Sequence, residues 1–289
     1  MDIRAILMGL AFALMWSSAF TSARIIVADA SPLLALSLRY LISGGIGVGI
    51  ALALGQSWRL TPAQWRATIT FGLLQNAAYL GLNFIAMQTV EASLAAIVAS
   101  TMPLLVALAA WALLGEALRP LTVIGLIAGF VGVVLIMGAR IGAGVDLYGL
   151  ALCGIGALAL TAATLMVRGA TSGGNFLMVV GLQMLVGCAA LSLATLLFET
   201  PRINPTLPLA LAFAYTCLVP GLLATLVWFW LVNRIGATRA ATFHFLNPFF
   251  GVAVAALLLG ENLGPREILG VVIIAFGILA VQLSRQSRS

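Results

Sequence analysis

Residues 113–120 read LLGEALRP, and residues 258–265 read LLGENLGP. Both copies contain Gly-Glu-x-Leu-x-Pro, and 145 positions separate them in a chain of 289 residues. Glycine often ends a helix, and proline suits the first position of the next helix. The motif therefore predicts two equivalent helix–turn–helix connections. In each turn the glutamate, Glu116 or Glu261, is expected to accept free N–H groups at the start of the following helix.

The similarity extends beyond the motif. From Pro103 and Pro248 to Arg140 and Arg285 the two segments align without a gap and share eleven identities in 38 positions. A slightly different offset pairs residues 9–11 (GLA) with residues 149–151 (GLA). The chain is therefore expected to consist of two repeats, residues 1–142 and 143–289. In each repeat the motif glycine and proline are read as structural, namely Gly115 and Pro120, and Gly260 and Pro265.

The composition places the chain in a lipid bilayer. Hydrophobic residues make up 63% of it and charged residues 8%, whereas a soluble domain carries about 25% charged residues. A helix needs about 20 apolar residues to cross the hydrocarbon core. Ten such runs predict an all-α membrane protein with five transmembrane helices in each repeat. They cover about residues 5–27, 32–54, 63–88, 92–114, 120–139, 147–168, 175–198, 207–233, 238–259 and 265–284.

The arginines indicate the orientation, since the chain has no lysine. Following the ten spans, nine arginines fall on the side of the N-terminus and four on the other side. The nine are Arg4, Arg59, Arg66, Arg119, Arg168, Arg234, Arg239, Arg285 and Arg288, and the four are Arg24, Arg140, Arg202 and Arg266. Both termini are therefore expected in the cytoplasm of a bacterium, with the chain in its inner membrane. The net charge of +6 is read as a topology signal, and no nucleic-acid partner is expected.

An odd number of helices per repeat makes the second repeat enter the membrane from the opposite side. Inverted repeats of this kind are typical of secondary transporters, whose halves exchange conformations around a site near the midplane. Gly125 and Gly129 form a GxxxG pattern. Such a pattern serves packing within one chain as readily as dimerisation, so the sequence leaves monomer and homodimer open.

The two halves, the MWSSAF stretch at residues 15–20 and the Ala-rich segment leading into GEALRP resemble the EamA-type carriers of the drug/metabolite transporter superfamily. The resemblance covers essentially the whole chain. Within the family it points to the YddG-type exporters of aromatic amino acids, which also export methyl viologen. It implies that the first four helices of each half surround a central cavity, that the fifth and tenth pack outside, and that transport runs outward.

Polar residues within the apolar runs are candidates for the substrate site, because polar groups are costly in lipid. Asn76, Tyr79 and Asn83 share one helix face at i, i+3 and i+7. They are predicted to line the cavity, with hydrogen bonding between helices as the alternative. The equivalent face of the second repeat carries Pro220 and Trp228, which predicts a kinked helix with an aromatic wall.

A second candidate region is HFLNPFF at residues 244–250, with the only histidine of the chain, His244, and with Asn247. Pro248 cannot donate to the carbonyl oxygen of His244, so that oxygen is expected to lack a helical partner. Pro103 has the same effect in the first repeat. Broken helices at membrane depth are tolerated where neighbours or a water-filled cavity satisfy the freed groups.

The first span adds Trp16, Ser17 and Phe20 as residues predicted to contact substrate, with helix packing as the alternative. Arg39 is the one charge well within a span. A gating or structural role is expected for it, and binding of an anionic group is the alternative.

What the chain lacks narrows the function. No acidic residue lies in the middle of a span, and neither an ATP-binding motif nor a set of catalytic or metal-ligating residues is present. Neither enzymatic activity nor a cofactor is therefore expected. The prediction is a facilitative exporter of aromatic amino acids or related small amphiphiles. The alternative is an exporter of broader range, proton-coupled through His244.

Overall fold

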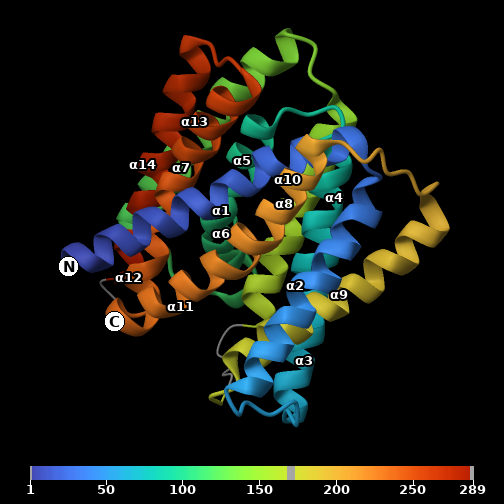
Figure 1. Cartoon of the computed structure of the whole chain (residues 1–289). Helices are drawn as coiled ribbons and strands as arrows, with labels where there is room; N and C mark the ends of the chain where they lie inside the picture. The colour runs from blue at the N-terminus through green and yellow to red at the C-terminus, as the bar shows by residue number, and fades with distance from the viewer. Residues whose placement is uncertain (1, 168–172, 287–289) are drawn as a thin grey trace. The chain divides into compact units, whose positions relative to one another are not determined.

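The computed structural model describes residues 2–167 and 173–286, and the elements named in it are all helical (Figure 1). Arg168 and Arg288 lie outside the described residues. In chain order the elements are α1 (Ile3–Asp29), α2 (Pro32–Ala53), α3 (Pro62–Phe71), η1 (Gly72–Tyr79), α4 (Leu80–Ala86), α5 (Ala92–Ser100), α6 (Met102–Leu114), α7 (Pro120–Gly142), α8 (Leu147–Met166), α9 (Phe176–Phe198), α10 (Leu207–Thr216), η2 (Cys217–Leu223), α11 (Ala224–Ile235), α12 (Ala237–Ala241), η3 (Thr242–Leu246), α13 (Asn247–Leu259) and α14 (Pro265–Gln286).

Within the described ranges, ten continuous helical stretches are long and apolar enough to cross a membrane. Several of them join two or three elements, as α3, η1 and α4 do between residues 62 and 86. The predicted ten-helix, all-α fold is thereby confirmed. The predicted boundary between the two repeats falls in the loop between α7 and α8.

The repeated motif forms the same turn twice. Gly115 ends α6 with φ of +66°, and Gly260 ends α13 with φ of +68°. This left-handed conformation costs glycine nothing because it has no Cβ atom. The next helix then begins at a proline, Pro120 in α7 and Pro265 in α14.

Four spans contain a break, and the breaks occupy equivalent positions in the two repeats. The fourth span changes from α5 to α6 at Thr101, just before Pro103, and the ninth passes through the 3-10 segment η3 before Pro248. The third and eighth spans each contain a π-helical segment, η1 from residue 72 and η2 from residue 217, which are 145 positions apart. Pro220 lies inside η2, whereas η1 contains no proline.

The structure corrects one expectation at Pro248. The sequence predicts that the carbonyl oxygen of His244 lacks a helical partner. In the structure the backbone tightens into η3, and the N–H of Asn247 donates to that oxygen. A 3-10 turn forms this i to i+3 hydrogen bond, so the proline changes the type of helix without leaving that carbonyl free.

Contacts divide the chain into two compact units, which we describe separately. Unit 1 comprises Met1–Thr21, Thr89–Ala151 and Leu223–Ser289, and unit 2 comprises Ser22–Gln88 and Leu152–Leu222. Each unit combines helices from both halves of the sequence, so neither unit corresponds to one repeat.

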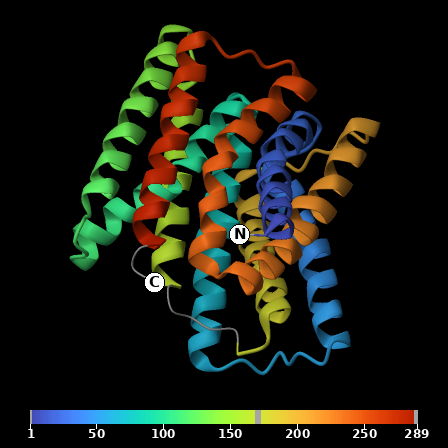
Figure 2. The ribbon, with the colours of Figure 1, turned by 90° about the vertical axis from the view of Figure 1, so that its left-hand side faces the viewer.

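In unit 1, α7 and α14 run antiparallel along each other (Figure 2). A Cβ atom on Gly125 would lie 2.6 Å from the carbonyl oxygen of Gly277, and one on Gly132 would lie 2.8 Å from that of Gly270. Gly270 and Gly277 are the repeat equivalents of Gly125 and Gly132. The exchanged pairing is the signature of a local two-fold axis perpendicular to both helices, which is the symmetry of an inverted repeat. These glycines therefore serve packing within the chain.

Unit 2 has a similar exchange, between α2 and α9. The N-cap residues Ser31 and Asn175 stand 144 positions apart. Ser31 Oγ accepts the N–H of Arg202, 2.9 Å away, and Asn175 Oδ1 accepts the N–H of Ser57, also 2.9 Å away. The end of each helix thus supports the start of the other, as expected for two copies of one element facing in opposite directions.

Candidate functional site

An aromatic cluster surrounds His244 in unit 1. Its ring centroid lies 5.4 Å from that of Phe12, 5.8 Å from that of Trp16 and 5.4 Å from that of Trp228. Phe12 and Trp228 also contact each other, with centroids 4.6 Å apart. The structure therefore brings together three residues that the sequence singled out, Trp16, Trp228 and His244. We call Phe12, Trp16, Trp228 and His244 the aromatic cluster.

Phe12 is the member that the sequence reasoning missed. It lies on the same face of α1 as Trp16 and Phe20, at i, i+4 and i+8, and the rings of Trp16 and Phe20 lie 5.9 Å apart. An aromatic stripe at this spacing was the available signal. Phe12 and Phe20 are buried, whereas Trp16, Trp228 and His244 are half-buried. The cluster thus keeps partly accessible ring surface.

Asn247 connects the aromatic cluster to a polar group. Its Nδ2 atom lies 2.9 Å from Nδ1 of His244, which fixes the orientation of the imidazole. Asn247 is 2% exposed, and its Oδ1 atom has no hydrogen-bond partner among the described residues. The hydroxyl groups of Ser17 and Thr21 on α1 are likewise buried without a partner there. Unsatisfied buried polar groups are costly, so each is a candidate for contact with water or a ligand.

A second cluster lies in unit 2, and it holds three predicted residues, Asn76, Tyr79 and Asn83, together with Tyr40. The hydroxyl of Tyr40 donates to Oδ1 of Asn76 at 3.4 Å, and Nδ2 of Asn83 donates to the carbonyl oxygen of Tyr79 at 2.8 Å. The hydroxyl of Tyr79 is buried and has no partner among the described residues. These residues belong to unit 2, whereas the aromatic cluster belongs to unit 1. We call Tyr40, Asn76, Tyr79 and Asn83 the amide–phenol cluster.

The π-helical segment η1 explains part of this arrangement. Asn76 and Tyr79 lie within η1, and Asn83 lies one turn beyond it. A wide turn disturbs the normal backbone bonding, and the Asn83 side chain supplies a donor to Tyr79 at its end. Gly156 of α8 packs against this point, where a Cβ atom would lie 2.7 Å from Nδ2 of Asn83. One half of the Asn83 amide therefore has a structural role.

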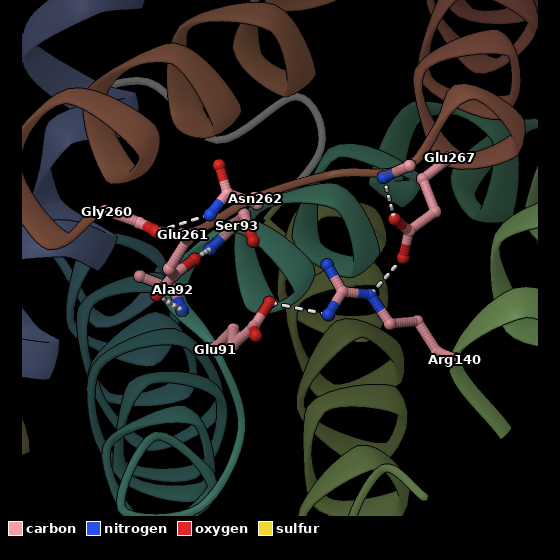
Figure 3. Close-up of polar contacts among 9 residues, drawn as sticks. Glu91, Ala92, Ser93, Arg140, Gly260, Glu261, Asn262 and Glu267 are labelled. Carbon is pink, nitrogen blue, oxygen red and sulfur yellow. Dashed lines mark hydrogen bonds and ion pairs between the residues drawn. The ribbon is translucent and has the colours of Figure 1, made fainter. Parts of the chain in front are cut away.

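A charged network joins three elements of unit 1 (Figure 3). Nη1 of Arg140, at the end of α7, lies 2.7 Å from Oε2 of Glu91, which precedes α5. Nε of Arg140 also pairs with Glu267 in the first turn of α14. Glu267 in turn accepts the N–H of Gly264 at 2.5 Å. The sequence reasoning missed this network, because Glu91, Arg140 and Glu267 lie in three separate segments.

Glu261 belongs to the same region but differs from its prediction. The sequence predicts that it caps the following helix, α14. Its carboxylate instead accepts the N–H groups of Ala92 and Ser93, each at 2.9 Å, and so caps α5 (Figure 3). Ala92 lies 169 positions from Glu261 in the sequence. In the first turn of α14 the acidic residue is Glu267, which accepts the N–H of Gly264. In the first repeat, the backbone N–H of Glu116 donates to the carbonyl oxygen of Ala110 at 3.2 Å.

Two acidic side chains outside the spans have partners that stabilise their charged form. A hydrogen bond of 2.6 Å from the hydroxyl of Thr89 holds the pKa of Asp146 below its ordinary value. The side chain of Arg234 hydrogen-bonds Asp2 and lowers its pKa to about 2. Neither acid contacts the aromatic cluster.

Within residues 2–167 and 173–286, no group of three or more metal-ligating side chains comes together. The three cysteines, Cys153, Cys188 and Cys217, form no disulfide there.

The sequence repeat and the ten spans have a counterpart among known proteins. The model of the EamA-like transporter family matches the chain twice, over residues 3–138 and 147–283. The chain belongs to the EamA-like transporter family. This EamA-like protein is therefore a secondary transporter and not an enzyme, and it is a multi-pass membrane protein that moves a small molecule.

Two relatives show how far the similarity reaches. The uncharacterized transporter YvbV of Bacillus subtilis is 26% identical over 276 residues, which cover 95% of the EamA-like chain and 90% of YvbV. The aromatic amino acid exporter YddG of Ancylobacter novellus is 31% identical over 138 residues, 48% of this chain and 47% of YddG. A solved crystal structure is 24% identical in sequence, and its alignment with this protein spans 100% of both chains. The TM-score of 0.69 shows that the two proteins share a fold.

Proposed function

We propose that this EamA-like protein exports small amphiphilic metabolites, and that the aromatic cluster contacts their apolar part. The observation that carries the proposal is the arrangement of Phe12, Trp16 and Trp228 around His244, with half-buried rings. Aromatic side chains bind ring systems and cations through their faces and edges. The unpartnered Oδ1 atom of Asn247 adds an acceptor for a donor group of the solute.

Aromatic amino acids are the first solutes to test within this class. Their rings match the aromatic cluster, and YddG, whose name specifies aromatic amino acid export, resembles this chain over about half its length. A broader range of metabolites or drugs is the second candidate. It is favoured by YvbV, which resembles nearly the whole chain and whose name specifies no substrate.

Replacing Trp228 by alanine tests the proposed contact. Cells that produce the transporter are loaded with a phenylalanine-containing dipeptide, and the efflux of free phenylalanine is measured. Trp228→Ala is expected to reduce the efflux about tenfold, which corresponds to about 1.4 kcal/mol of lost contact. Trp230→Ala is the matched control, because Trp230 lies on the same helix and is 54% exposed. Equal efflux from both variants at equal protein levels would show that Trp228 does not contact the transported solute.

We also propose that transport is facilitative and runs down the gradient of the solute. A proton-coupled carrier needs a group that binds the proton within the membrane, and no acidic residue lies in the middle of a span. Among the described residues, the ring and hydrogen-bond contacts of His244 are with Phe12, Trp16, Trp228 and Asn247, none of which is charged.

A pH gradient across proteoliposomes with equal amino-acid concentrations on both sides tests the coupling. No net accumulation is expected, and His244→Gln should change the rate without changing this result. Uphill accumulation that disappears in His244→Gln would instead establish proton coupling through the histidine.

We propose further that both termini face the cytoplasm of a bacterium, on the grounds of the nine-to-four distribution of arginines. A reporter enzyme that is active only outside the cytoplasm, fused after Ser289, should therefore give no signal. The same reporter inserted in the loop between α7 and α8 should be active. The reverse pattern would invert the proposed topology.

A further inference from the structure

Arg39 is a buried cation without an ion-pair partner among the described residues. It lies on α2 and is 6% exposed, so its side chain does not reach out to the surface of the protein. Its guanidinium carbon lies 5.3 Å from the centre of the Tyr40 ring. Among the described residues it forms no ion pair, and its Nε atom has no hydrogen-bond partner. A buried charge without a partner is strongly unfavourable.

No acid in residues 2–167 and 173–286 forms an ion pair with Arg39. Glu199 contacts the start of α2, where it accepts the N–H groups of Leu33 and Leu34 at 2.9 and 3.1 Å. Leu34 precedes Arg39 by five residues, or about 7.5 Å along the helix axis. Both oxygens of Glu199 are thus occupied by the start of the helix.

Of the two phenols in the amide–phenol cluster, one has a donor without a partner among the described residues. Tyr40, which lies under the guanidinium, donates its hydroxyl proton to Asn76. Tyr79 lies one turn beyond Asn76 on the same span, and the residue is 2% exposed. Its hydroxyl group has no hydrogen-bond partner among the described residues. A guanidinium carries donors only, and a phenol donates readily. A group with several acceptor oxygens and a negative charge would satisfy them, whereas an ammonium would not.

We propose that Arg39 is the carboxylate subsite of the transporter, so that the solute is an organic monocarboxylate or a zwitterion such as an amino acid. A carboxylate accepts two parallel hydrogen bonds from a guanidinium, which is the strongest pairing available to arginine. The inference rests on the proposed function in taking the ligand to be the transported solute. Against a purely structural role, the guanidinium makes no hydrogen bond to a neighbouring helix within the described residues.

The test uses 3-phenylpropionate and its neutral amide, 3-phenylpropionamide, as probes of the purified protein in detergent. The thermal unfolding midpoint is measured as a function of probe concentration. The carboxylate should raise the midpoint of the wild type, and the amide should not. In Arg39→Gln the apparent affinity for the carboxylate should fall about 10- to 100-fold, and Arg39→Lys should retain part of it.

Arg24→Gln is the matched control. Arg24 lies in the same unit, and its Nη1 atom donates to the backbone oxygen of Met87. Its loss should lower the midpoint without changing the response to the carboxylate. If Arg39→Gln is not recovered in folded form, Arg39→Lys and Tyr79→Phe supply the comparison, and both should weaken the response.

Three outcomes overturn the proposal. The first is an equal response of wild type and Arg39 variants, and the second is no response of the wild type to 3-phenylpropionate. The third is an equal response to chloride or phosphate, which would make the site a general anion site. Transport assays separate this proposal from the function. Arg39-dependent stabilisation without transport of 3-phenylpropionate, of an amino acid or of another small amphiphile would contradict the proposed function alone. Tryptamine is tryptophan without its carboxylate. If wild type and Arg39→Gln each transport tryptophan and tryptamine at equal rates, the carboxylate subsite alone is contradicted.

Discussion

Gly125→Ala is expected to destabilise the protein, whereas Gly138→Ala on the same helix is not. A Cβ atom on Gly125 would lie 2.6 Å from the carbonyl oxygen of Gly277 and 2.9 Å from Cγ2 of Val281, so α7 and α14 would have to separate. Overpacking of this kind costs about 1–3 kcal/mol. A Cβ atom on Gly138 meets nothing within 4 Å. There alanine should contribute about 0.5–1 kcal/mol through its better helix propensity.

The thermal unfolding midpoints of both variants in detergent decide this prediction. The symmetry of unit 1 adds a second arm, since Gly270 is the repeat equivalent of Gly125. A Cβ atom on Gly270 would lie 2.9 Å from the carbonyl oxygen of Gly132, so Gly270→Ala should also lower the midpoint. If Gly125→Ala and Gly270→Ala unfold at the wild-type temperature, the close approach of the two helices is not a feature of the protein in solution.

Arg140→Gln is expected to have a stability effect of similar or larger size. Arg140 stands between Glu91 and Glu267, and the side chains of Arg140 and Glu267 are 14% and 10% exposed (Figure 3). Removing the cation leaves two carboxylates close together, one of them largely desolvated. Breaking a buried ion pair from one side costs about 3–5 kcal/mol. Because Glu91 is 40% exposed and partly screened by water, we expect about 2–4 kcal/mol.

Two further variants make this prediction specific. Arg234→Gln removes the partner of Asp2 in an exposed pair, whose side chains are 42% and 48% exposed, and should leave the midpoint unchanged. The double variant Arg140→Gln with Glu267→Gln removes the uncompensated buried charge and should recover part of the loss. A single variant as stable as the wild type, or a double variant less stable than the single one, would contradict the role of Arg140.

The ten spans could be predicted because bilayer thickness sets the length of an apolar run. The turns at Gly115 and Gly260 could also be predicted, since glycine and proline act on the conformation of their own backbone. The capping of α5 by Glu261 could not be predicted, because the helix that Glu261 stabilises lies 169 positions away in the sequence. The π-helical segment η1 left no local signal either, because it contains no proline, in contrast to η2.

The candidate residues show the same division. The face shared by Asn76, Tyr79 and Asn83 follows from helical periodicity, and their side chains are buried in unit 2. That His244 is surrounded by Phe12, Trp16 and Trp228 depends on how α1, α11 and η3 pack, which no local pattern specifies. Likewise, that Arg39 forms no ion pair within the described part of the chain depends on where the acidic side chains lie in three dimensions.

Counterflow in proteoliposomes tests the proposed transport most directly. Liposomes containing the purified protein are preloaded with unlabelled phenylalanine and diluted into labelled phenylalanine at low concentration, with no ion gradient. We expect a transient accumulation of label that requires the unlabelled solute inside and is reduced in Trp228→Ala. Uptake no greater than in protein-free liposomes, for phenylalanine, tyrosine and tryptophan alike, would contradict transport of aromatic amino acids.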